Sequence, residues 1–427
     1  MRILMLIEWN PGRGGAEAFA LRLRNGLRQA GDEVRLLTSA AGSAADGTAD
    51  YVVPTSQRRA VRALLQIHDP RAAATVRRAV REFRPDVAWI NMFALQLSPS
   101  VFGALGSTPS VLFVSDYKLL CPLSSRLLPD GSLCKQNAGI ACLAAGCLSP
   151  PHWLRDQLRY AAVRRALCRV HTMVACSAWV QKELQRAGWP SQVLPTPVVP
   201  RPARPRRPSS EPSFLFIGRL DREKGVDLLL GAFARMPSPG RLHLAGVGPC
   251  RRDLEALARS LGLGDRVRFL GWLEREAIDR ELTTAWAVVV PSLWAEPLGM
   301  VAQEAIAAGV PVIASAAGGL SEIVQDGRHG LLFPNGDGVA LTACLTRIAT
   351  QADFPEHHVA GAVVQEVAQR FDPEATLEHW REILAAASEG RVGTNASTAF
   401  SDTPKAPHQA PAAHAPCQGS QGHAPPG

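Results

Sequence analysis

Short apolar runs alternate with longer amphipathic stretches along most of this chain. In the first half, apolar runs predict strands at 2–7, 33–38, 86–91, 110–115 and 172–177. The second half repeats the pattern, with strand or strand-to-loop units predicted at 213–217, 242–249, 267–273, 287–291 and 311–315. Runs that are apolar throughout are typical of parallel strands covered by helices on both faces. The pattern therefore predicts an α/β protein with two doubly wound, Rossmann-like domains that face each other across a cleft.

Two changes in composition divide the chain. A run rich in Pro and Arg cannot hold a regular element and predicts an interdomain linker. The last forty or so residues are rich in Ala, Pro, Gly, Ser and His, which predicts a disordered tail. The predicted parts are a first domain with an insertion that contains cysteines, the linker, a second domain, a terminal helix and the tail, at 1–198 (insertion 117–150), 199–212, 213–370, 371–387 and 388–427.

A glycine-rich loop follows the first predicted strand and precedes a helix. The loop at 8–15 ends in Gly14 and Gly15, and an apolar stripe then predicts a helix that ends at Gly31. A strand, a glycine loop and a helix in this order can bring backbone N–H groups close to a phosphate. The alternative is a tight connection without a ligand, because the loop lacks G-x-G-x-x-G spacing. A longer Arg-rich segment, 56–84, is also predicted to be helical.

The most informative stretch, 285–315, holds two apolar runs with a loop and a helix between them. Glu296 lies in the loop, and Glu304 lies on a helix predicted from about Leu298 and closed by Gly309. Because helical side chains lean toward the N-terminus, Glu304 points to the end where unpaired N–H groups attract phosphate. A ligand with hydroxyls at both ends and a diphosphate between them, such as a nucleotide sugar, fits this arrangement. Two solvated carboxylates at a helix edge are the alternative.

The same stretch carries a family resemblance. EPLGMVAQE, with its E-x7-E spacing, is followed by AAGVPVIASAAGGLSEIV and DGRHGLLFPNGD. These residues resemble the donor-binding half of the family-4 (group 1) retaining glycosyltransferases of GT-B architecture, closely over 214–338 and more loosely over 1–200. The resemblance implies that the first domain binds an acceptor, that the second binds a nucleotide diphosphate sugar, and that the terminal helix crosses back to the first domain. The implied reaction moves a hexosyl-type unit to an acceptor hydroxyl, in cell-surface polysaccharide or lipid-linked glycan assembly.

The resemblance also assigns roles to residues of the second domain. Arg219 offers a planar fork and Lys224 a compact charge, and both are expected to contact the donor diphosphate. Glu296 is expected to contact sugar hydroxyls, with attack as a nucleophile as the alternative. Glu304 is expected to bind the ribose. The full set of further donor contacts is expected at Gly14, Gly15, Gly299, Met300, Val301 and Glu304. No D-x-D motif occurs in the sequence, so we expect Arg219 and Lys224 to take the place of a metal ion. We expect no cofactor; the nucleotide diphosphate sugar is the donor substrate.

Asp116 comes directly after the strand predicted at 110–115. That strand end faces the cleft, where open α/β sheets bind their ligands. We therefore expect Asp116 to orient or deprotonate the acceptor hydroxyl, with a loop-capping role as the alternative. Many family members read H-D-Y before a C-P pair, whereas this chain reads SDYKLLCP, with Ser115 in the place of His. The acid–base role of that His does not carry over.

Four of the nine cysteines gather within the insertion. Their spacing, C-x12-C-x7-C-x4-C, lacks the C-x2-C knuckle of most structural zinc sites. In a reducing compartment they are ordinary thiols or, as the alternative, ligands of a structural metal. The residues concerned are Cys121, Cys134, Cys142 and Cys147.

Charge is shared unevenly between the halves. Residues 1–200 hold 24 Lys and Arg against 13 Asp and Glu, whereas the rest holds 22 against 25. The segment 152–171 is a basic helix, either core-facing with a solvated face or docked on anionic lipid. We expect peripheral contact between the basic first domain and an anionic membrane surface, and no nucleic-acid partner, since no RNA-binding aromatic signature occurs. With no apolar run long enough to span a bilayer and no signal peptide, the expected location is cytoplasmic, at the inner face of the membrane.

Two other functions fit the same motifs. A nucleotide-sugar epimerase of GT-B architecture needs no acceptor. A non-catalytic nucleotide-sugar-binding protein is suggested by Ser115 and by the cysteine-containing insertion. A nicotinamide dehydrogenase is disfavoured, because neither half shows G-x-G-x-x-G with an acidic residue about twenty positions further on.

Overall fold

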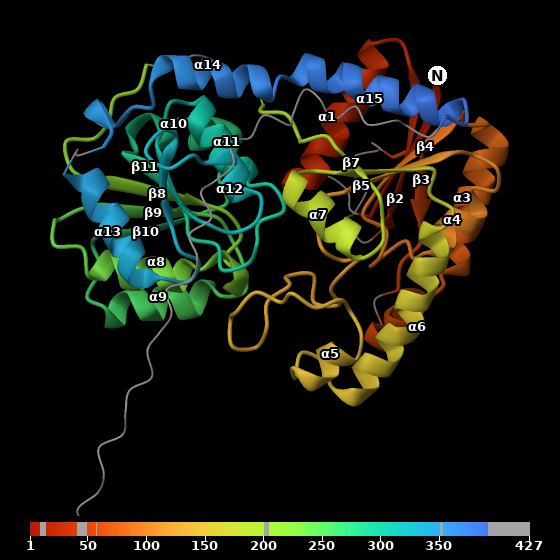
Figure 1. Ribbon diagram of the computed structural model, residues 1–427, viewed down its shortest axis with the longest axis horizontal. Helices are drawn as coiled ribbons and strands as arrows, with labels where there is room; N and C mark the ends of the chain where they lie inside the picture. The colour runs from red at the N-terminus through yellow and green to blue at the C-terminus, as the bar shows by residue number, and fades with distance from the viewer. Residues whose placement is uncertain (9–13, 41–48, 57, 200–204, 351–352, 392–427) are drawn as a thin grey trace, which may run out of the picture.

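A computed structural model gives the fold as two α/β domains, each built around a parallel sheet (Figure 1). It describes residues 1–8, 14–40, 49–56, 58–199, 205–350 and 353–391. Three predictions reach beyond these ranges: the loop at 8–15 includes 9–13, the linker at 199–212 includes 200–204, and most of the tail is 392–427, all outside the described residues. The two-domain α/β architecture predicted from the apolar runs is confirmed.

The first domain has a seven-stranded sheet in the order β3-β2-β1-β4-β5-β6-β7, with every neighbouring pair parallel. Its central strands are apolar throughout because helices cover both faces. The strands are β1 (Arg2–Ile7), β2 (Glu33–Ser39), β3 (Tyr51–Val53), β4 (Val87–Asn91), β5 (Ser110–Val114), β6 (Thr172–Ala175) and β7 (Gln192–Val193). The helices are α1 (Gly15–Gln29), α2 (Arg59–Leu65), α3 (Pro70–Phe83), α4 (Ser100–Ala104), α5 (Ile140–Ala144), α6 (Pro150–Leu167) and α7 (Ala178–Arg186).

The second domain repeats this plan with six parallel strands in the order β10-β9-β8-β11-β12-β13. They are β8 (Ser213–Ile217), β9 (Arg241–Ala245), β10 (Val267–Gly271), β11 (Ala287–Val290), β12 (Val312–Ser315) and β13 (Gly330–Phe333). The helices are α8 (Val226–Ala234), α9 (Arg251–Ser260), α10 (Arg275–Thr284), α11 (Met300–Ala307), α12 (Leu320–Ile323), α13 (Gly338–Ala349) and α14 (Gly361–Arg370). Strand order reverses between β1 and β4 and between β8 and β11, and ligands of doubly wound sheets bind at such reversals.

Two predicted helices differ from the observed ones. The segment 56–84 contains two helices, because the Asp69 carboxylate caps a new helix and Pro70 occupies its first position. The helix predicted from about Leu298 begins at Met300, because Gly299 adopts a left-handed φ of 99°. None of the described helices is long and apolar enough to cross a bilayer.

The last helix, α15 (Pro373–Ser388), packs on the first domain although it follows the second in sequence (Figure 1). Trp380 is fully buried there, with its ring centroid 5.3 Å from that of Phe113, 5.9 Å from that of Trp89 and 6.4 Å from that of Phe19. Arg381 adds an ion pair to Asp32, with 3.3 Å between Nε and Oδ2. The helix therefore completes the hydrophobic core of a domain from which the whole second domain separates it in sequence.

We predict that Trp380→Ala destabilises the protein by about 3–5 kcal/mol, because it removes the ring at the centre of this aromatic cluster. Trp272→Ala serves as the control, since that side chain is 57% exposed and its loss is expected to change stability by about 0.5 kcal/mol or less. Urea unfolding measures both. Equal losses for the two variants contradict a core role for α15.

Candidate functional site

Two loops of the second domain meet at the carboxyl ends of β8 and β11. The loop after β8 ends at Gly225, whose φ is 66° and where an added Cβ would lie 2.1 Å from the Pro291 carbonyl oxygen. The Glu223 carbonyl accepts a hydrogen bond of 2.9 Å from the Leu293 amide. Only glycine at position 225 allows this approach. The contact brings Lys224 to the loop that carries Glu296.

Lys224 and Glu296 form a buried ion pair at this contact. The Lys224 Nζ lies 2.6 Å from Glu296 Oε1, and the Ser292 hydroxyl donates to the same oxygen at 2.6 Å. Burial alone would raise the pKa of the Glu296 carboxyl, but Lys224 and Ser292 more than offset this and lower the pKa below its ordinary value. Lys224 also lies 5.0 Å from the ring centroid of Trp294. Glu296 is therefore an ionised carboxylate held in a fixed position.

Arg219 lies on the same loop but is not part of this pair. Its side chain is 55% exposed, and its guanidinium pairs with Asp221 and, at 3.0 Å, with Glu223. Both partners belong to its own loop. An anionic ligand that contacts Arg219 has to compete with these two carboxylates.

The starts of α11 and α1 face each other across the cleft. A Cβ added to Gly15 would lie 2.8 Å from the Met300 sulfur, so the Met300 side chain packs directly against the start of α1. Gly14 precedes α1, and Val301 and Glu304 are half-buried on α11. Burial lowers the pKa of Arg22 on α1, and the nearby Glu304 carboxylate opposes that shift. The structure thus places Gly15 against Met300, and Arg22 within electrostatic reach of Glu304, while the donor contacts of these residues stay a prediction.

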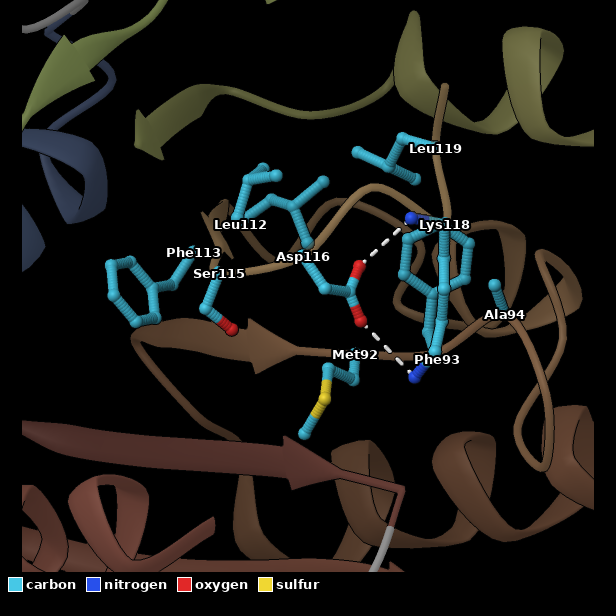
Figure 2. Close-up of a pocket in the computed structure, with 10 residues that line it drawn as sticks. Met92, Phe93, Ala94, Leu112, Phe113, Ser115, Asp116, Lys118 and Leu119 are labelled. Atoms are coloured by element: carbon cyan, nitrogen blue, oxygen red, sulfur yellow. Dashed lines mark hydrogen bonds and ion pairs between the residues drawn. The ribbon is translucent and has the colours of Figure 1, made fainter. Parts of the chain in front are cut away.

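On the first domain, Asp116 belongs to a charged cluster (Figure 2). The Lys118 Nζ lies 3.1 Å from Asp116 Oδ2 and 3.6 Å from Glu8 Oε2. Glu8 is fully buried at the end of β1, and its other oxygen accepts backbone N–H bonds from Leu95 and Gln96. Burial on its own would lower the pKa of Lys118, but the carboxylates outweigh it and raise the pKa. Lys118 therefore stays charged in the cleft.

Two more features of this cluster bear on the prediction for Asp116. The Lys118 amide donates a hydrogen bond of 3.0 Å to Asp116 Oδ1, which is the loop-capping contact named as the alternative. Asp116 makes this contact in addition to its ion pair with the Lys118 side chain. Glu17 on α1 is buried close enough for its charge to be felt by Lys118, and burial raises the pKa of the Glu17 carboxyl. Sequence reasoning did not select Glu8, Glu17 or Lys118. Their position at or just beyond the ends of parallel strands, or at the start of α1, is the signal that could have found them.

Ser115, in the place of the family histidine, donates a hydrogen bond of 3.1 Å to the side-chain oxygen of Asn91.

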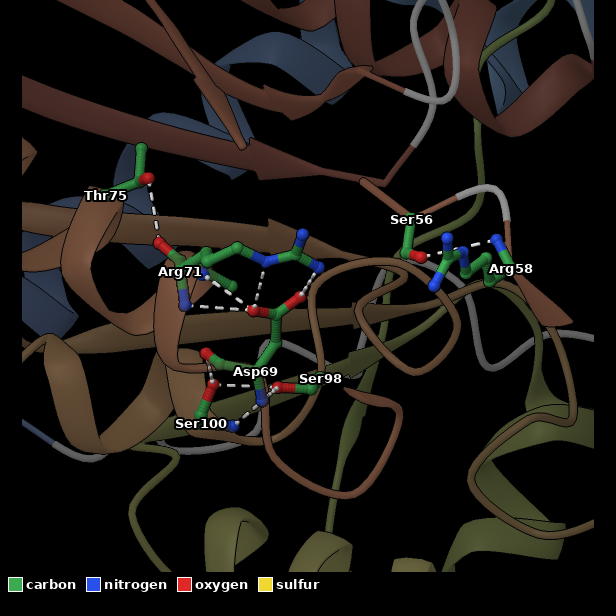
Figure 3. Close-up of polar contacts among 8 residues, drawn as sticks. Ser56, Arg58, Asp69, Arg71, Thr75, Ser98 and Ser100 are labelled. Carbon is green, nitrogen blue, oxygen red and sulfur yellow. Dashed lines mark hydrogen bonds and ion pairs between the residues drawn. The ribbon is translucent and has the colours of Figure 1, made fainter. Parts of the chain in front are cut away.

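Another polar cluster, around Asp69, forms its hydrogen bonds within its own loops (Figure 3). The Asp69 carboxylate accepts from the amides of Arg71 and Ala72, and its own amide donates to the Ser98 hydroxyl at 2.9 Å. This cluster has a structural role at the start of α3.

The four cysteines of the insertion are free thiols. Among the described residues, which include all four, no group of three or more His, Cys, Asp or Glu is placed to hold a metal ion. Burial raises the pKa of the Cys121 thiol, as it does for Cys147. The charges of Cys142, Cys134 and Cys121 also raise the pKa of Cys147, and the alternative of a structural metal stays a hypothesis.

Comparison with known proteins identifies the family. The model of the glycosyl transferase 4-like domain matches residues 14–199, and that of the glycosyl transferases group 1 matches residues 201–362. The chain belongs to the group 1 glycosyltransferases. The resemblance found in the sequence is confirmed at this level.

Individual relatives cover less of the chain. An uncharacterized glycosyltransferase of Methanocaldococcus jannaschii is 36% identical over 156 residues, which are 36% of this chain and 39% of the relative. Other curated relatives that the chain matches are likewise covered over less than half of their length.

Solved structures extend the fold to 90% of the chain. Sucrose-phosphate synthase from Thermosynechococcus elongatus is 23% identical, is covered over 99% of its length and superposes with a TM-score of 0.70. Anabaena HepE in complex with UDP-glucose is 20% identical, covered in full, with a TM-score of 0.64. At these identities the similarity establishes the GT-B fold alone.

We predict that Lys224→Met destabilises the protein by about 3–5 kcal/mol, because it leaves the Glu296 carboxylate buried without a cation. Adding Glu296→Gln removes that charge and is expected to restore part of the loss. Urea unfolding of both single variants and the double variant measures the coupling. Additive losses contradict a direct interaction between the two side chains.

Proposed function

We propose that this chain is a retaining glycosyltransferase that moves a hexosyl-type unit from a nucleotide diphosphate sugar to an acceptor hydroxyl. The observation that carries the proposal is the buried pair of Lys224 and Glu296 beside the start of α11, opposite the start of α1. A fixed carboxylate suits sugar hydroxyls, and cations beside two helix starts suit a diphosphate. Both halves of a nucleotide sugar are thereby provided for.

The difficult step in such a reaction is departure of the diphosphate while the sugar becomes oxocarbenium-like. Negative charge then grows on the leaving oxygens. Lys224, Arg219 and the backbone amides at the start of α11 are the groups that stabilise it, acting as preorganised dipoles and charges in the place of a metal ion. Glu296 orients the sugar, and Glu304 binds the ribose.

The nucleotide sugar is supported by a structural neighbour. The Anabaena protein HepE was solved in complex with UDP-glucose, and its fold covers 90% of this chain. On the acceptor side, the Asp116 Oδ2 lies 3.1 Å from the Lys118 Nζ, and an oxygen of this side chain can accept a hydrogen bond from the attacking hydroxyl. The acceptor we propose is a glycan or lipid-linked glycan of the cell surface.

A peripheral membrane contact accompanies this proposal. Ile140 on α5 and Leu154 and Leu158 on α6 are 67%, 60% and 57% exposed, and Arg164 and Arg165 on α6 are exposed as well. Figure 1 shows α5 and the start of α6 at the end of the first domain opposite α15. Apolar side chains beside arginines on one helix are suited to the surface of an anionic bilayer at the inner face of the cell membrane.

The donor assignment is tested by thermal stabilisation of the full chain with a set of nucleotide sugars. A bound donor raises the melting temperature, because it binds the folded state alone. We expect Glu304→Ala to weaken that donor by about tenfold or more, the effect of about 1.4 kcal/mol in binding. Glu82→Ala, at an exposed carboxylate on α3, is the control and keeps the affinity.

Two results contradict this donor assignment, and two further results contradict glycosyl transfer. Stabilisation by no nucleotide sugar removes the proposed donor. Unchanged affinity in Glu304→Ala removes the ribose contact. A donor that is bound but neither hydrolysed nor transferred points to the non-catalytic binding protein, and epimer formation without acceptor points to the epimerase.

The membrane contact is tested by sedimentation with lipid vesicles at low salt. We expect the protein to bind vesicles that contain phosphatidylglycerol and not to bind neutral phosphatidylcholine vesicles, since arginine side chains are attracted to anionic headgroups. Low salt is used because salt screens this attraction. Leu154→Ser combined with Leu158→Ser is expected to abolish most binding, whereas Val339→Ser, at a 76% exposed side chain of the second domain, keeps it. Equal binding to both kinds of vesicle refutes the contact.

A further inference from the structure

Tyr117 connects the two domains at the loop that carries Glu296. It follows Asp116 in sequence and is fully buried, although its hydroxyl reaches the other domain. That hydroxyl donates a hydrogen bond of 2.7 Å to the carbonyl oxygen of Ala295, which is 178 positions further along the chain. Its ring meets the Trp294 ring edge-on, with 5.9 Å between the centroids and 86° between the planes. The residue therefore touches two consecutive residues that precede Glu296.

The other side of Glu296 has a matching contact. The Ser177 hydroxyl donates to the carbonyl oxygen of Pro297, and Ser177 is fully buried at the start of α7 in the first domain. The Glu296 carbonyl accepts a 2.7 Å hydrogen bond from the Gly319 amide of its own domain. Three consecutive carbonyls, at 295, 296 and 297, thus each have a donor. Two of these donors come from the first domain.

The Tyr117 ring also reaches the ion pair through Trp294. Lys224, which holds Glu296, lies 5.0 Å from the centroid of the ring that Tyr117 contacts. Burial raises the pKa of the Tyr117 hydroxyl well above its ordinary value, so the hydroxyl stays protonated and can only donate to the carbonyl. The ring belongs to the buried core of the first domain as well, so only the hydroxyl and the ring edge reach the second domain.

We propose that Tyr117, supported by Ser177, is a positioning residue through which the first domain sets the orientation of the Glu296 carboxylate. The geometry of the donor site is then complete only when the two domains are in contact. Asp116 and Tyr117 are neighbours in sequence, so the loop that faces the acceptor also fixes the carboxylate that faces the sugar. This inference rests on the proposed function and adds a residue to it.

Tyr117→Phe is the informative variant, because it removes one hydroxyl and keeps the ring against Trp294. We expect kcat to fall by about tenfold or more, the rate equivalent of one lost hydrogen bond, while the KM for the donor changes by about twofold or less. We also expect the acidic limb of the kcat–pH profile to move to higher pH, because Glu296 is held less firmly against Lys224. Tyr51→Phe is the matched control, since Tyr51 is buried in the first domain and its hydroxyl accepts a 3.3 Å bond from Arg35. It is expected to change neither quantity.

A second measurement is independent of turnover. In urea unfolding, Tyr117→Phe and Glu296→Gln are expected to be non-additive, whereas Tyr51→Phe and Glu296→Gln are expected to be additive. Additive losses for the first pair, or an unchanged kcat in Tyr117→Phe, overturn the inference. If the unaltered chain turns over no nucleotide sugar, the proposed function fails, while the coupling between Tyr117 and Glu296 still decides the positioning role.

Discussion

The contact between the Lys224 ammonium and the Glu296 carboxylate constrains the ligand-facing edge of the second domain. A carboxylate in a buried position is costly unless a cation and a hydrogen-bond donor accompany it. Lys224 and Ser292 fill these two roles, and both come from loops that can meet only because position 225 lacks a side chain. The pair therefore requires the loop after β8, the loop after β11 and their close approach. A change at any one of the three is felt at the other two.

Lys224 and Arg219 differ in the burial of their ion-pair partners, and this difference affects how easily each cation can change its partner. Lys224 has one buried partner, and leaving that partner uncompensated is expensive. Arg219 is half-exposed, and exposed ion pairs such as those it makes with Asp221 and Glu223 contribute about 0–1 kcal/mol. In the proposed function, a diphosphate would replace the partners of Arg219 at little cost, whereas it would meet Lys224 already in place. The fold fixes Lys224 through a buried carboxylate and leaves the Arg219 side chain half-exposed.

The sequence was informative where structure is local and uninformative where it is not. Apolar runs located ten strands, because strands buried on both faces leave a continuous signal. The end of α11 at Gly309 was predicted from that residue alone, whereas the start of α3 at Asp69 was missed inside a longer Arg-rich pattern. Lys118 and Glu8 are 110 positions apart, and Tyr117 and Ala295 are 178 apart. No periodicity relates such pairs, so they emerge only when both sheets are assembled.

Specific hydrogen bonds and a shared hydrophobic cluster join the two domains beside the site. Within the described residues the chain passes between the domains near Val198 and again near Phe371. The Val198 amide donates a hydrogen bond of 2.9 Å to the Phe371 carbonyl, so the two connecting segments are joined to each other. Tyr117 belongs to the first domain, so its hydrogen bond to Ala295 requires the two domains to be in contact. Its hydrogen bond, like the one from Ser177, contributes only about 0.5–1.5 kcal/mol. A ligand that contacts both domains adds free energy of comparable or greater size to the closed arrangement. In the proposed role of Tyr117, contact between the domains and placement of Glu296 are therefore coupled, because the hydroxyl that joins the domains also holds the backbone beside the carboxylate.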